Sequence, residues 1–304
     1  MLKFFYYYIR SMRLYYGFVT ATTVLAGLCL VRLDTGVSGA WTARDAALLA
    51  IGFLSWGFNQ IFSDWCDRKE DAINAPHRPM VTGALKPLPA FAVSAAGLAA
   101  IAVAGYLMSP WTLAFLALGG ALNIAYSLLK RVPVLNCLVY ACAISCCALF
   151  AIAGVAGRAP NGGELSFVAI FVLPAHLLMC HNSYYKDIAG DRAAGVRTLQ
   201  MFLPMLSRAV SGCLPCAAAA LAVVVMFANG IALLSVFFAT LVVALSVAFL
   251  AAVSRGRLHR ATCLNCQLCV LLLHLWIFRW TWLVAMASLV AIQLLFLWYN
   301  DEKE

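Results

Sequence analysis

Charged side chains are scarce in this chain: Asp, Glu, Lys and Arg make up 11% of its 304 residues, whereas 64% are hydrophobic. A soluble domain carries roughly a quarter charged residues and about half apolar ones. The composition therefore excludes an ordinary soluble domain and predicts an all-α polytopic membrane protein. No polar, low-complexity segment is long enough to separate domains, so we expect a single transmembrane domain over residues 1–304.

Polar segments that could hold a disulfide framework or a zinc site are also lacking. The 12 cysteines lie almost entirely within apolar runs, including Cys263, Cys266 and Cys269 at a spacing of three. Cysteine in a packed apolar helix behaves as a small hydrophobic residue, whereas structural zinc uses ligands from polar turns. The net charge of +9 fits basic loops beside a membrane, so we expect no nucleic-acid partner.

Hydrophobic runs of about 20 residues, the length that crosses a bilayer, recur along the whole chain. Arg279 separates the last two runs, which form either two spans or one span with an interfacial piece. We expect a bundle of nine or ten transmembrane helices around a central cavity, capped by loops on the cytoplasmic side. The predicted spans are 14–31, 46–65, 89–108, 111–129, 134–156, 165–185, 206–228, 231–253, 262–278 and 281–299.

Basic residues are distributed unevenly between the two sides of the ten-span arrangement. One side carries 17 of the 21 Lys and Arg residues, and the other side carries 4. Loops rich in Lys and Arg remain on the cytoplasmic side of a membrane. We therefore expect the first side to face the cytoplasm, and that side also holds two acidic stretches.

The first acidic stretch, residues 59–83, reads NQIFSDWCDRKEDAINAPHRPMVTG. On a continuous helix, Gln60, Asp64, Asp67 and Asp71 would share one stripe, because a helix turns about 100° per residue. Carboxylates gathered in this way repel one another unless a cation lies between them. Oxygen ligands without His or Cys indicate Mg²⁺, while the alternative is a solvated acidic helix end.

The second acidic stretch, residues 183–199, reads SYYKDIAGDRAAGVRTL. Asp187 and Asp191 are four residues apart and would share a helix face. Like the first stretch, it closes a long apolar run and leads into basic residues. Two acidic clusters that meet beside Lys and Arg would form a site for a diphosphate held by Mg²⁺.

The order and spacing of these motifs resemble those of the UbiA-type intramembrane prenyltransferases. That family's first motif reads Asn-Asp-x-x-Asp-x-x-x-Asp and leads into Ala-Ile-Asn-x-Pro-x-Arg-Pro; this chain has SDWCDRKED and then AINAPHRP. The second motif, Asp-x-x-x-Asp with a Gly-x-x-Thr-Leu tail, is matched by DIAGDRAAGVRTL, and YSLLKR matches an element after the fourth span. The chain departs from the family at Ser63, which stands where the family has Asn.

The resemblance implies a site in which two Mg²⁺ ions hold a diphosphate between the two motifs. It assigns metal binding and catalysis to Asp64, Asp67, Asp71, Asp187 and Asp191. Ser63, or Asn59 one turn earlier, is an alternative further metal ligand. The diphosphate would contact Arg13, Arg78, Lys130, Lys186, Arg192, Asn123 and Tyr126.

The function implied by the resemblance is Mg²⁺-dependent transfer of a prenyl group from an isoprenyl diphosphate to an aromatic or other lipophilic acceptor, within membrane lipid. The alternative is a membrane terpene cyclase on the same scaffold, which needs no acceptor and which the Ser63 departure favours. A third hypothesis is a transporter or lipid-binding protein. Two intact aspartate clusters at one membrane face argue against it.

Two histidines, His176 and His181, lie inside the predicted span 165–185. Ionisable side chains within a membrane are often functional, so they could bind an acceptor or take up a proton. The preferred interpretation is a pair of packed histidines that form hydrogen bonds to their surroundings.

The charge distribution generates a topology prediction. Single reporter cysteines, introduced into a background without the native ones, should label from the cytoplasmic side in loops 72–88 and 192–200, and from the opposite side in loop 158–163. The reason is that basic loops resist translocation. Labelling by a membrane-impermeant thiol reagent on intact and inverted vesicles measures this, and labelling of all three loops from one side would contradict it.

Overall fold

The computed structural model describes residues 2–34, 41–129, 132, 134–193, 195–228, 232–276 and 281–299. Within these residues all regular secondary structure is helical and there is no strand, which confirms the all-α prediction. The elements are α1 (Leu2–Met12), α2 (Leu14–Asp34), α3 (Ala43–Cys66), α4 (Arg68–Asn74), α5 (Pro87–Met108), α6 (Pro110–Leu128), α7 (Leu135–Ala156), α8 (Gly162–Phe167), the π-helix η1 (Val168–Val172), α9 (Leu173–Ser183), α10 (Ile188–Ala193), α11 (Leu199–Phe202), α12 (Pro204–Ala228), α13 (Ala232–Ser254), α14 (Leu258–His274) and α15 (Trp282–Tyr299).

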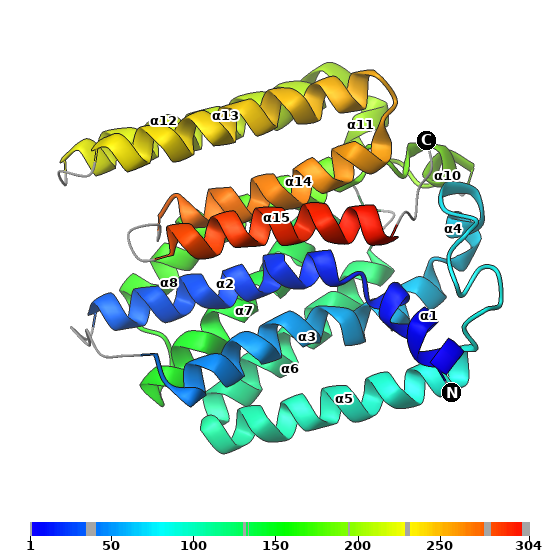
Figure 1. Cartoon of the computed structure of the whole chain (residues 1–304), viewed down its shortest axis with the longest axis horizontal. Coiled ribbons are helices and arrows are strands. Elements are labelled where there is room, and N and C mark those ends of the chain that lie inside the picture. The colour runs from blue at the N-terminus through cyan, green and yellow to red at the C-terminus, as the bar shows by residue number, and fades with distance from the viewer. Residues whose placement is uncertain are drawn as a thin grey trace.

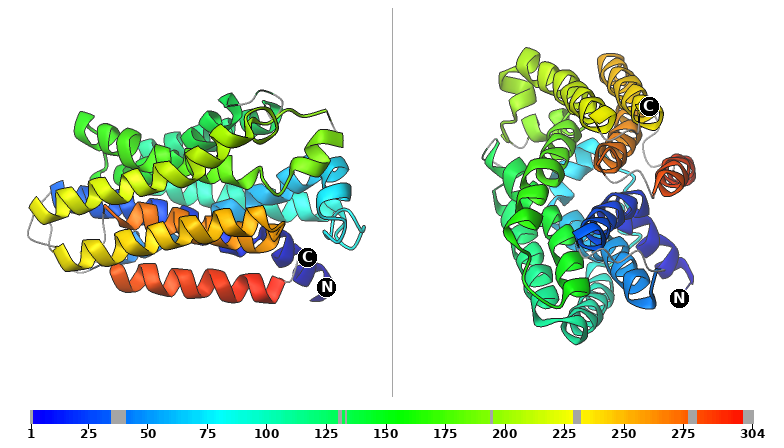
Figure 2. Two further views of the ribbon diagram at one scale, coloured as in Figure 1. Left: turned by 90° about the horizontal axis from the view of Figure 1, so that it is seen from above. Right: turned by 90° about the vertical axis from the view of Figure 1, so that its left-hand side faces the viewer.

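The long helices lie side by side as one bundle, and successive helices run in opposite directions (Figure 1). The short helices α1, α4, α10 and α11 gather at one end of this bundle, on the right in Figure 1. Figure 2 shows that α12 and α13 form a pair along one flank, and that α15 lies on the outside. Helix α15 packs against α14 and α2.

Nine helical segments in the described part of the chain are long and apolar enough to cross a membrane, in agreement with a polytopic protein. The predicted span 262–278 corresponds to α14, which has only 17 residues and is not among the nine. Helix α14 nevertheless traverses the bundle (Figure 1), and every residue from Ala261 to His274 is buried. Asn265 and Gln267 donate hydrogen bonds to the carbonyls of Met179 and Leu289. Because α14 faces protein rather than lipid, it tolerates amide side chains that lower its hydropathy.

The predicted span 165–185 is one crossing segment with an irregular middle. The π-helix η1 lies directly before Pro174, and the Leu173 amide donates to the carbonyl of Val168, five residues earlier. Proline has no amide hydrogen and crowds the carbonyl four residues before it, so one wide turn relieves the conflict.

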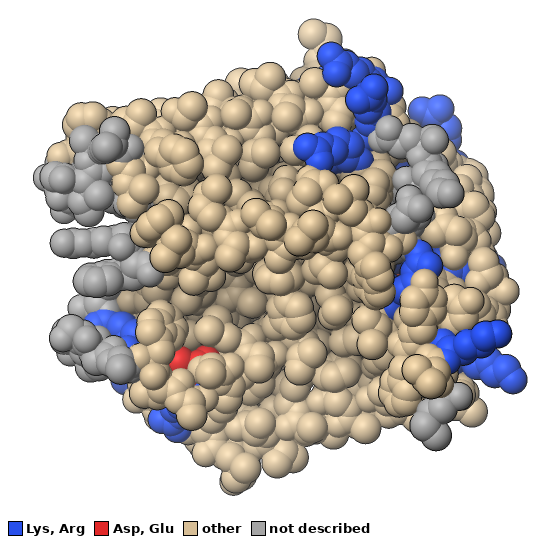
Figure 3. All heavy atoms as spheres, in the orientation of Figure 1, with Lys and Arg blue, Asp and Glu red and all other residues tan. Residues whose placement is uncertain are grey.

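The two ends of the bundle differ in charge. Lys and Arg side chains gather over the end that carries α1, α4, α10 and α11, with fewer at the other end (Figure 3). At that other end, Arg32 pairs with Asp45, and Arg158 pairs with Glu164 at 2.9 Å. These pairs join α2 to α3 and the end of α7 to α8. The candidate site lies at the opposite end of the bundle.

Close packing of α2 on α7 depends on a glycine. A Cβ added at Gly27 would lie 2.4 Å from the carbonyl oxygen of Ala148, whereas one added at Gly120 would meet nothing within 4 Å. Small residues at such positions let helix backbones approach each other in a membrane.

Gly27→Ala should therefore lower the apparent melting temperature in detergent, since backbone atoms must move apart. Gly120→Ala is the matched control, and it should be neutral or stabilise by up to about 1 kcal/mol because alanine is the better helix former. Tryptophan fluorescence during a thermal ramp measures both. Equal melting temperatures for the two variants would show that the α2–α7 contact is not limiting.

Candidate functional site

The first acidic stretch does not form one continuous helix. We expected Gln60, Asp64, Asp67 and Asp71 on one stripe of a continuous helix, and the continuous helix is wrong: α3 ends at Cys66, and α4 begins at Arg68. Asp67 joins the two helices with φ −88° and ψ 6°. Asp64 and Asp71, on either side of this break, are each paired with a different arginine.

Asp64 is buried in the last turn of α3. Its Oδ1 accepts hydrogen bonds from Arg13 Nη2 at 2.6 Å and from Gln60 Nε2 at 2.8 Å. Burial alone would lower the pKa of Arg13, but the facing carboxylate of Asp64 raises it well above the ordinary value. Arg13 therefore remains a cation at any physiological pH.

Asp71, on α4, pairs with Arg78 in the loop that follows. Burial and the neighbouring Arg13 lower the pKa of Arg78, but the carboxylates of Asp71 and Asp64 outweigh them and raise it. The loop is held in place because Met80 and Leu85 are buried in an apolar cluster with residues of α1 and α3. Arg78 is thus a fixed cation beside the first motif.

Asn74 joins the first motif to the second. Its Oδ1 accepts the Gly190 amide at 2.7 Å, and its Nδ2 donates to the carbonyl of Asp187 at 3.4 Å. A Cβ added at Gly190 would lie 2.4 Å from the Asn74 amide, so only glycine permits this approach. This pair of hydrogen bonds, the Asn74 clasp, holds α4 against α10.

The two motifs and the basic residues meet around one cavity, the site cavity, at the end of the bundle that carries α4 and α10. It is lined by Arg13, Tyr16, Trp56, Gln60, Ser63, Asp67, Glu70, Asp71, Asn74, Arg78, Asn123, Tyr126, Tyr140, Met179, Ser183, Tyr184, Lys186 and Asp187. The described lining thus contains four carboxylates and three cations. A wall of aromatic rings and apolar side chains completes it.

Most of the predicted site residues line this cavity, but four of the described ones do not. Asp191 is fully buried on α10, Arg192 is exposed, and Asp64 is covered by Arg13. Asn59 donates to the Ser55 carbonyl at 2.9 Å within its own helix and lines neighbouring cavities instead. Lys130 lies outside the described residues.

Other lining residues were not among the predicted site residues. Asn74 is the asparagine of the AINAPHRP segment, so this motif could have identified it as a site residue. Glu70 follows Asp67 by three residues, so it faces the same way. Tyr184 accepts from Asn136 and lies 3.3 Å from the Tyr126 hydroxyl. No spacing rule connects these tyrosines, because they come from different helices.

Both histidines of the second motif's span are packed side chains outside the lining of the site cavity. His176 is fully buried and forms a hydrogen bond to Thr23 at 2.8 Å. His181 contacts Ser207 and the side chain of Gln200. Of the two interpretations drawn from the sequence, packed histidines with hydrogen bonds to their surroundings match the structure.

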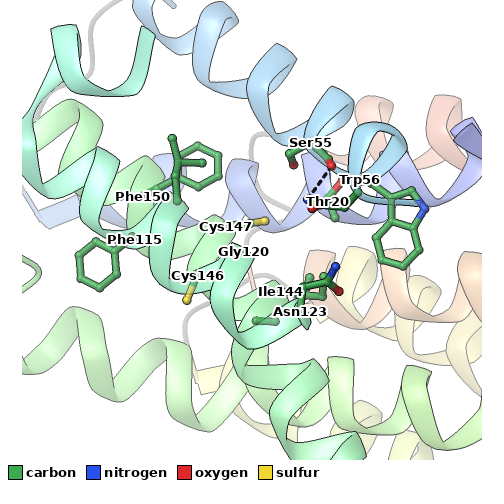
Figure 4. A pocket seen from close by; sticks show the side chains of 14 residues that line it. Thr20, Ser55, Trp56, Phe115, Gly120, Asn123, Ile144, Cys146, Cys147 and Phe150 are labelled. Carbon is green, nitrogen blue, oxygen red and sulfur yellow. Dashed lines mark hydrogen bonds between the residues drawn. The ribbon is translucent and has the colours of Figure 1, made fainter. Parts of the chain in front are cut away.

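An apolar cavity adjoins the site cavity through residues that the two share. One part lies between α2, α3, α6 and α7, where Phe115 and Phe150 stand at one end and Asn123 at the other (Figure 4). A second part, of about 500 Å³, lies between α3, α5 and α6. Asn123 and Ser63 both face the site cavity and this second part. Charged and apolar compartments therefore adjoin at these two side chains.

The site cavity suits a divalent cation that arrives with an anionic ligand. The described residues contain no preformed cluster of three or more His, Cys, Asp or Glu that could hold a metal alone. Asp71 Oδ2 is buried and accepts no hydrogen bond from the described residues. Mg²⁺ is commonly bound by one or two carboxylates together with substrate phosphates. The donor set fits this mode and not a dedicated protein cage.

An all-helical membrane bundle with two aspartate motifs and arginines around one end cavity defines the class of protein. The chain belongs to the UbiA prenyltransferase family, whose family model matches residues 20–264. A UbiA homolog from Aeropyrum pernix superposes with a TM-score of 0.67 at 21% identity, covering 86% of this chain and 96% of that one. A UbiA homolog from Archaeoglobus fulgidus bound to GPP and Mg²⁺ gives 0.63 at 14% identity, covering 93% and 99%.

Curated relatives include a bacteriochlorophyll synthase 33 kDa chain from Rhodobacter capsulatus, 31% identical over 52% of this chain and 56% of that protein. A digeranylgeranylglyceryl phosphate synthase from Natronomonas pharaonis is 34% identical over 55% of this chain and 60% of that protein. The chain thus spans less than two thirds of the length of these relatives.

The Asn74 clasp can be tested without any ligand. Asn74→Ala should increase hydrogen exchange across α10 by about tenfold, because the Gly190 amide loses its buried acceptor. Asn59→Ala is the matched control, since the Asn59 side chain bonds only within α3, and it should leave α10 unchanged. Mass spectrometry of peptides covering residues 187–193 measures the exchange. Unchanged exchange in Asn74→Ala would show that α10 is held by other contacts.

Proposed function

We propose that this protein is an intramembrane prenyltransferase that ionises an isoprenyl diphosphate and transfers the prenyl group to a lipophilic acceptor. The observation that carries the proposal is the single cavity lined by Asp67, Asp71 and Asp187 together with Arg13 and Arg78. Carboxylates for metal and guanidinium groups for phosphate are the two needs of diphosphate departure.

The aspartates of the two motifs would hold Mg²⁺ together with the diphosphate. Asp67 and Asp71 would supply the carboxylates of the first motif, and Asp187 would supply that of the second. Bound Mg²⁺ would supply Lewis-acid neutralisation of the leaving group. The Asp71 Oδ2 atom, buried without a hydrogen-bond donor among the described residues, supports this assignment.

The cations of the cavity would bind the phosphate oxygens that the metal leaves uncovered. Arg13 and Arg78 are fixed by Asp64 and Asp71, so their guanidinium groups need little reorganisation when the anion arrives. Lys186, next to Asp187 in the cavity lining, adds a third cation. Tyr16, Trp56 and Tyr140 exclude water from the region where the allylic carbon–oxygen bond breaks.

The prenyl chain would extend from the site cavity into the adjoining apolar cavity. The site cavity measures about 100 Å³, enough for a diphosphate head but not for an isoprenoid chain, whereas the neighbouring volume is about 500 Å³. The relatives include a bacteriochlorophyll synthase and a digeranylgeranylglyceryl phosphate synthase. We infer an amphiphilic acceptor that reaches the site from the membrane, with the site on the cytoplasmic side.

Purified protein should release pyrophosphate from geranylgeranyl diphosphate only with Mg²⁺ and an acceptor, and Asp187→Asn should lower the rate at least about 100-fold. The reason is that the variant removes one charge from the metal site while keeping the side chain's shape. Asp45→Asn, at the opposite end of the bundle, is the matched control and should stay within about threefold per folded molecule. A pyrophosphate assay with and without EDTA measures both.

The products decide between the two enzymatic hypotheses. Prenylated acceptor supports the transferase, whereas cyclic hydrocarbon or alcohol from the diphosphate alone would establish the cyclase. Asp187→Asn turnover within tenfold of the unmodified protein would overturn the metal–diphosphate site for both.

A further inference from the structure

The chain breaks between α1 and α2 at Arg13. Arg13 has φ +47°, in the left-handed region that side-chain-bearing residues seldom adopt. This backbone conformation ends α1 at Met12 and turns the Arg13 side chain toward Asp64 and the site cavity. Contacts with the surrounding structure must therefore stabilise Arg13 in this unfavourable backbone conformation.

The break removes hydrogen bonds that a continuous helix would form. Leu14 would donate to the carbonyl of Arg10, and the carbonyl of Ile9 would accept from Arg13. Instead the Arg13 amide donates to the Arg10 carbonyl at 3.4 Å. The Ile9 carbonyl and the Leu14 amide therefore need partners from elsewhere.

One atom near the other end of the sequence, the hydroxyl oxygen of Tyr299, forms a hydrogen bond to each of these groups. The hydroxyl of Tyr299, at the end of α15, accepts the Leu14 amide at 3.1 Å and donates to the Ile9 carbonyl at 2.8 Å. Arg10 Nη2 in turn donates to the Tyr299 carbonyl at 2.6 Å. Tyr299 is fully buried, and its ring packs edge-on against Tyr15 at 5.4 Å. Figure 1 shows the last turn of α15, in red, beside the α1–α2 junction.

We propose that Tyr299 is a positioning residue for diphosphate binding: its hydroxyl bridges the break in the chain and holds Arg13 where the guanidinium faces Asp64 and the site cavity. This inference rests on the proposed function, because it takes Arg13 as a phosphate ligand. Without the hydroxyl, the Ile9 carbonyl and the Leu14 amide lose the hydrogen bonds that replace their helical ones. The junction then gains by moving toward a regular helix, which withdraws Arg13 from the cavity.

Tyr299→Phe keeps the ring and removes only the bridging hydroxyl. Its Kd for geranylgeranyl thiolodiphosphate with Mg²⁺ should rise about tenfold, as expected for the loss of one buried hydrogen-bonding partner. Tyr8→Phe is the matched control: the Tyr8 hydroxyl is also buried, on α1, and contacts Ser94 at 2.8 Å, away from the break. Its Kd should change by less than about twofold, although both variants should lose similar thermal stability.

A double-variant comparison separates positioning from general loosening. In an Arg13→Ala background, Tyr299→Phe should change Kd by less than about twofold, because no arginine remains to be placed. Hydrogen exchange of residues 9–14 without ligand should increase in Tyr299→Phe and not in Tyr8→Phe. If Tyr299→Phe does not fold, Arg10→Gln carries the same test, because it releases the Tyr299 carbonyl.

The outcomes are distinct. Absence of analogue binding to the unmodified protein would overturn the proposed function itself. Binding that Tyr299→Phe weakens no more than Tyr8→Phe does, or that it weakens equally with and without Arg13, would overturn the positioning role while leaving the proposed function intact.

Discussion

Two buried carboxylate–guanidinium pairs, Asp64 with Arg13 and Asp71 with Arg78, are the interactions on which the candidate site depends. Either carboxylate alone would be unfavourable at the end of an apolar bundle, and removing one member of a buried pair costs about 3–5 kcal/mol. The two arginines and the two aspartates therefore keep charges of opposite sign close together at this end of the bundle.

Neither arginine lies within a membrane-crossing helix, so the rest of this end of the molecule serves to fix the backbone around them. The loop of Arg78 is anchored by Met80 and Leu85 against α1 and α3. Arg13 lies at a chain break that α15 supports. The Asn74 clasp then joins the second motif to this framework. The opposite end of the bundle is held by the Arg32–Asp45 and Arg158–Glu164 ion pairs.

The sequence predicted the crossing helices well, because hydropathy is a local signal, and most of the predicted site residues line one cavity in the fold. It could not predict the break at Asp67, since neither glycine nor proline marks it. The predicted span 262–278 identified α14 but begins four residues after this helix does. The amides of Asn265 and Gln267 are satisfied by neighbouring helices, which hydropathy cannot show. Tyr299 was equally invisible, because its role is a contact across 285 residues of sequence.

Ser63 shows how position changes the meaning of a departure from a family motif. From the sequence, Ser63 replaces a metal-binding asparagine of the family motif, and Asn59 is a candidate substitute. In the fold, Asn59 bonds back to the Ser55 carbonyl and faces the apolar compartments, so it lies outside the lining of the aspartate cavity. Ser63 instead lies where the site cavity meets the 500 Å³ apolar cavity. Serine is shorter than asparagine, so it leaves more room where the two cavities adjoin. The substitution therefore bears on the space between the charged and apolar cavities, whereas the carboxylates of Asp67, Asp71 and Asp187 still line the site cavity.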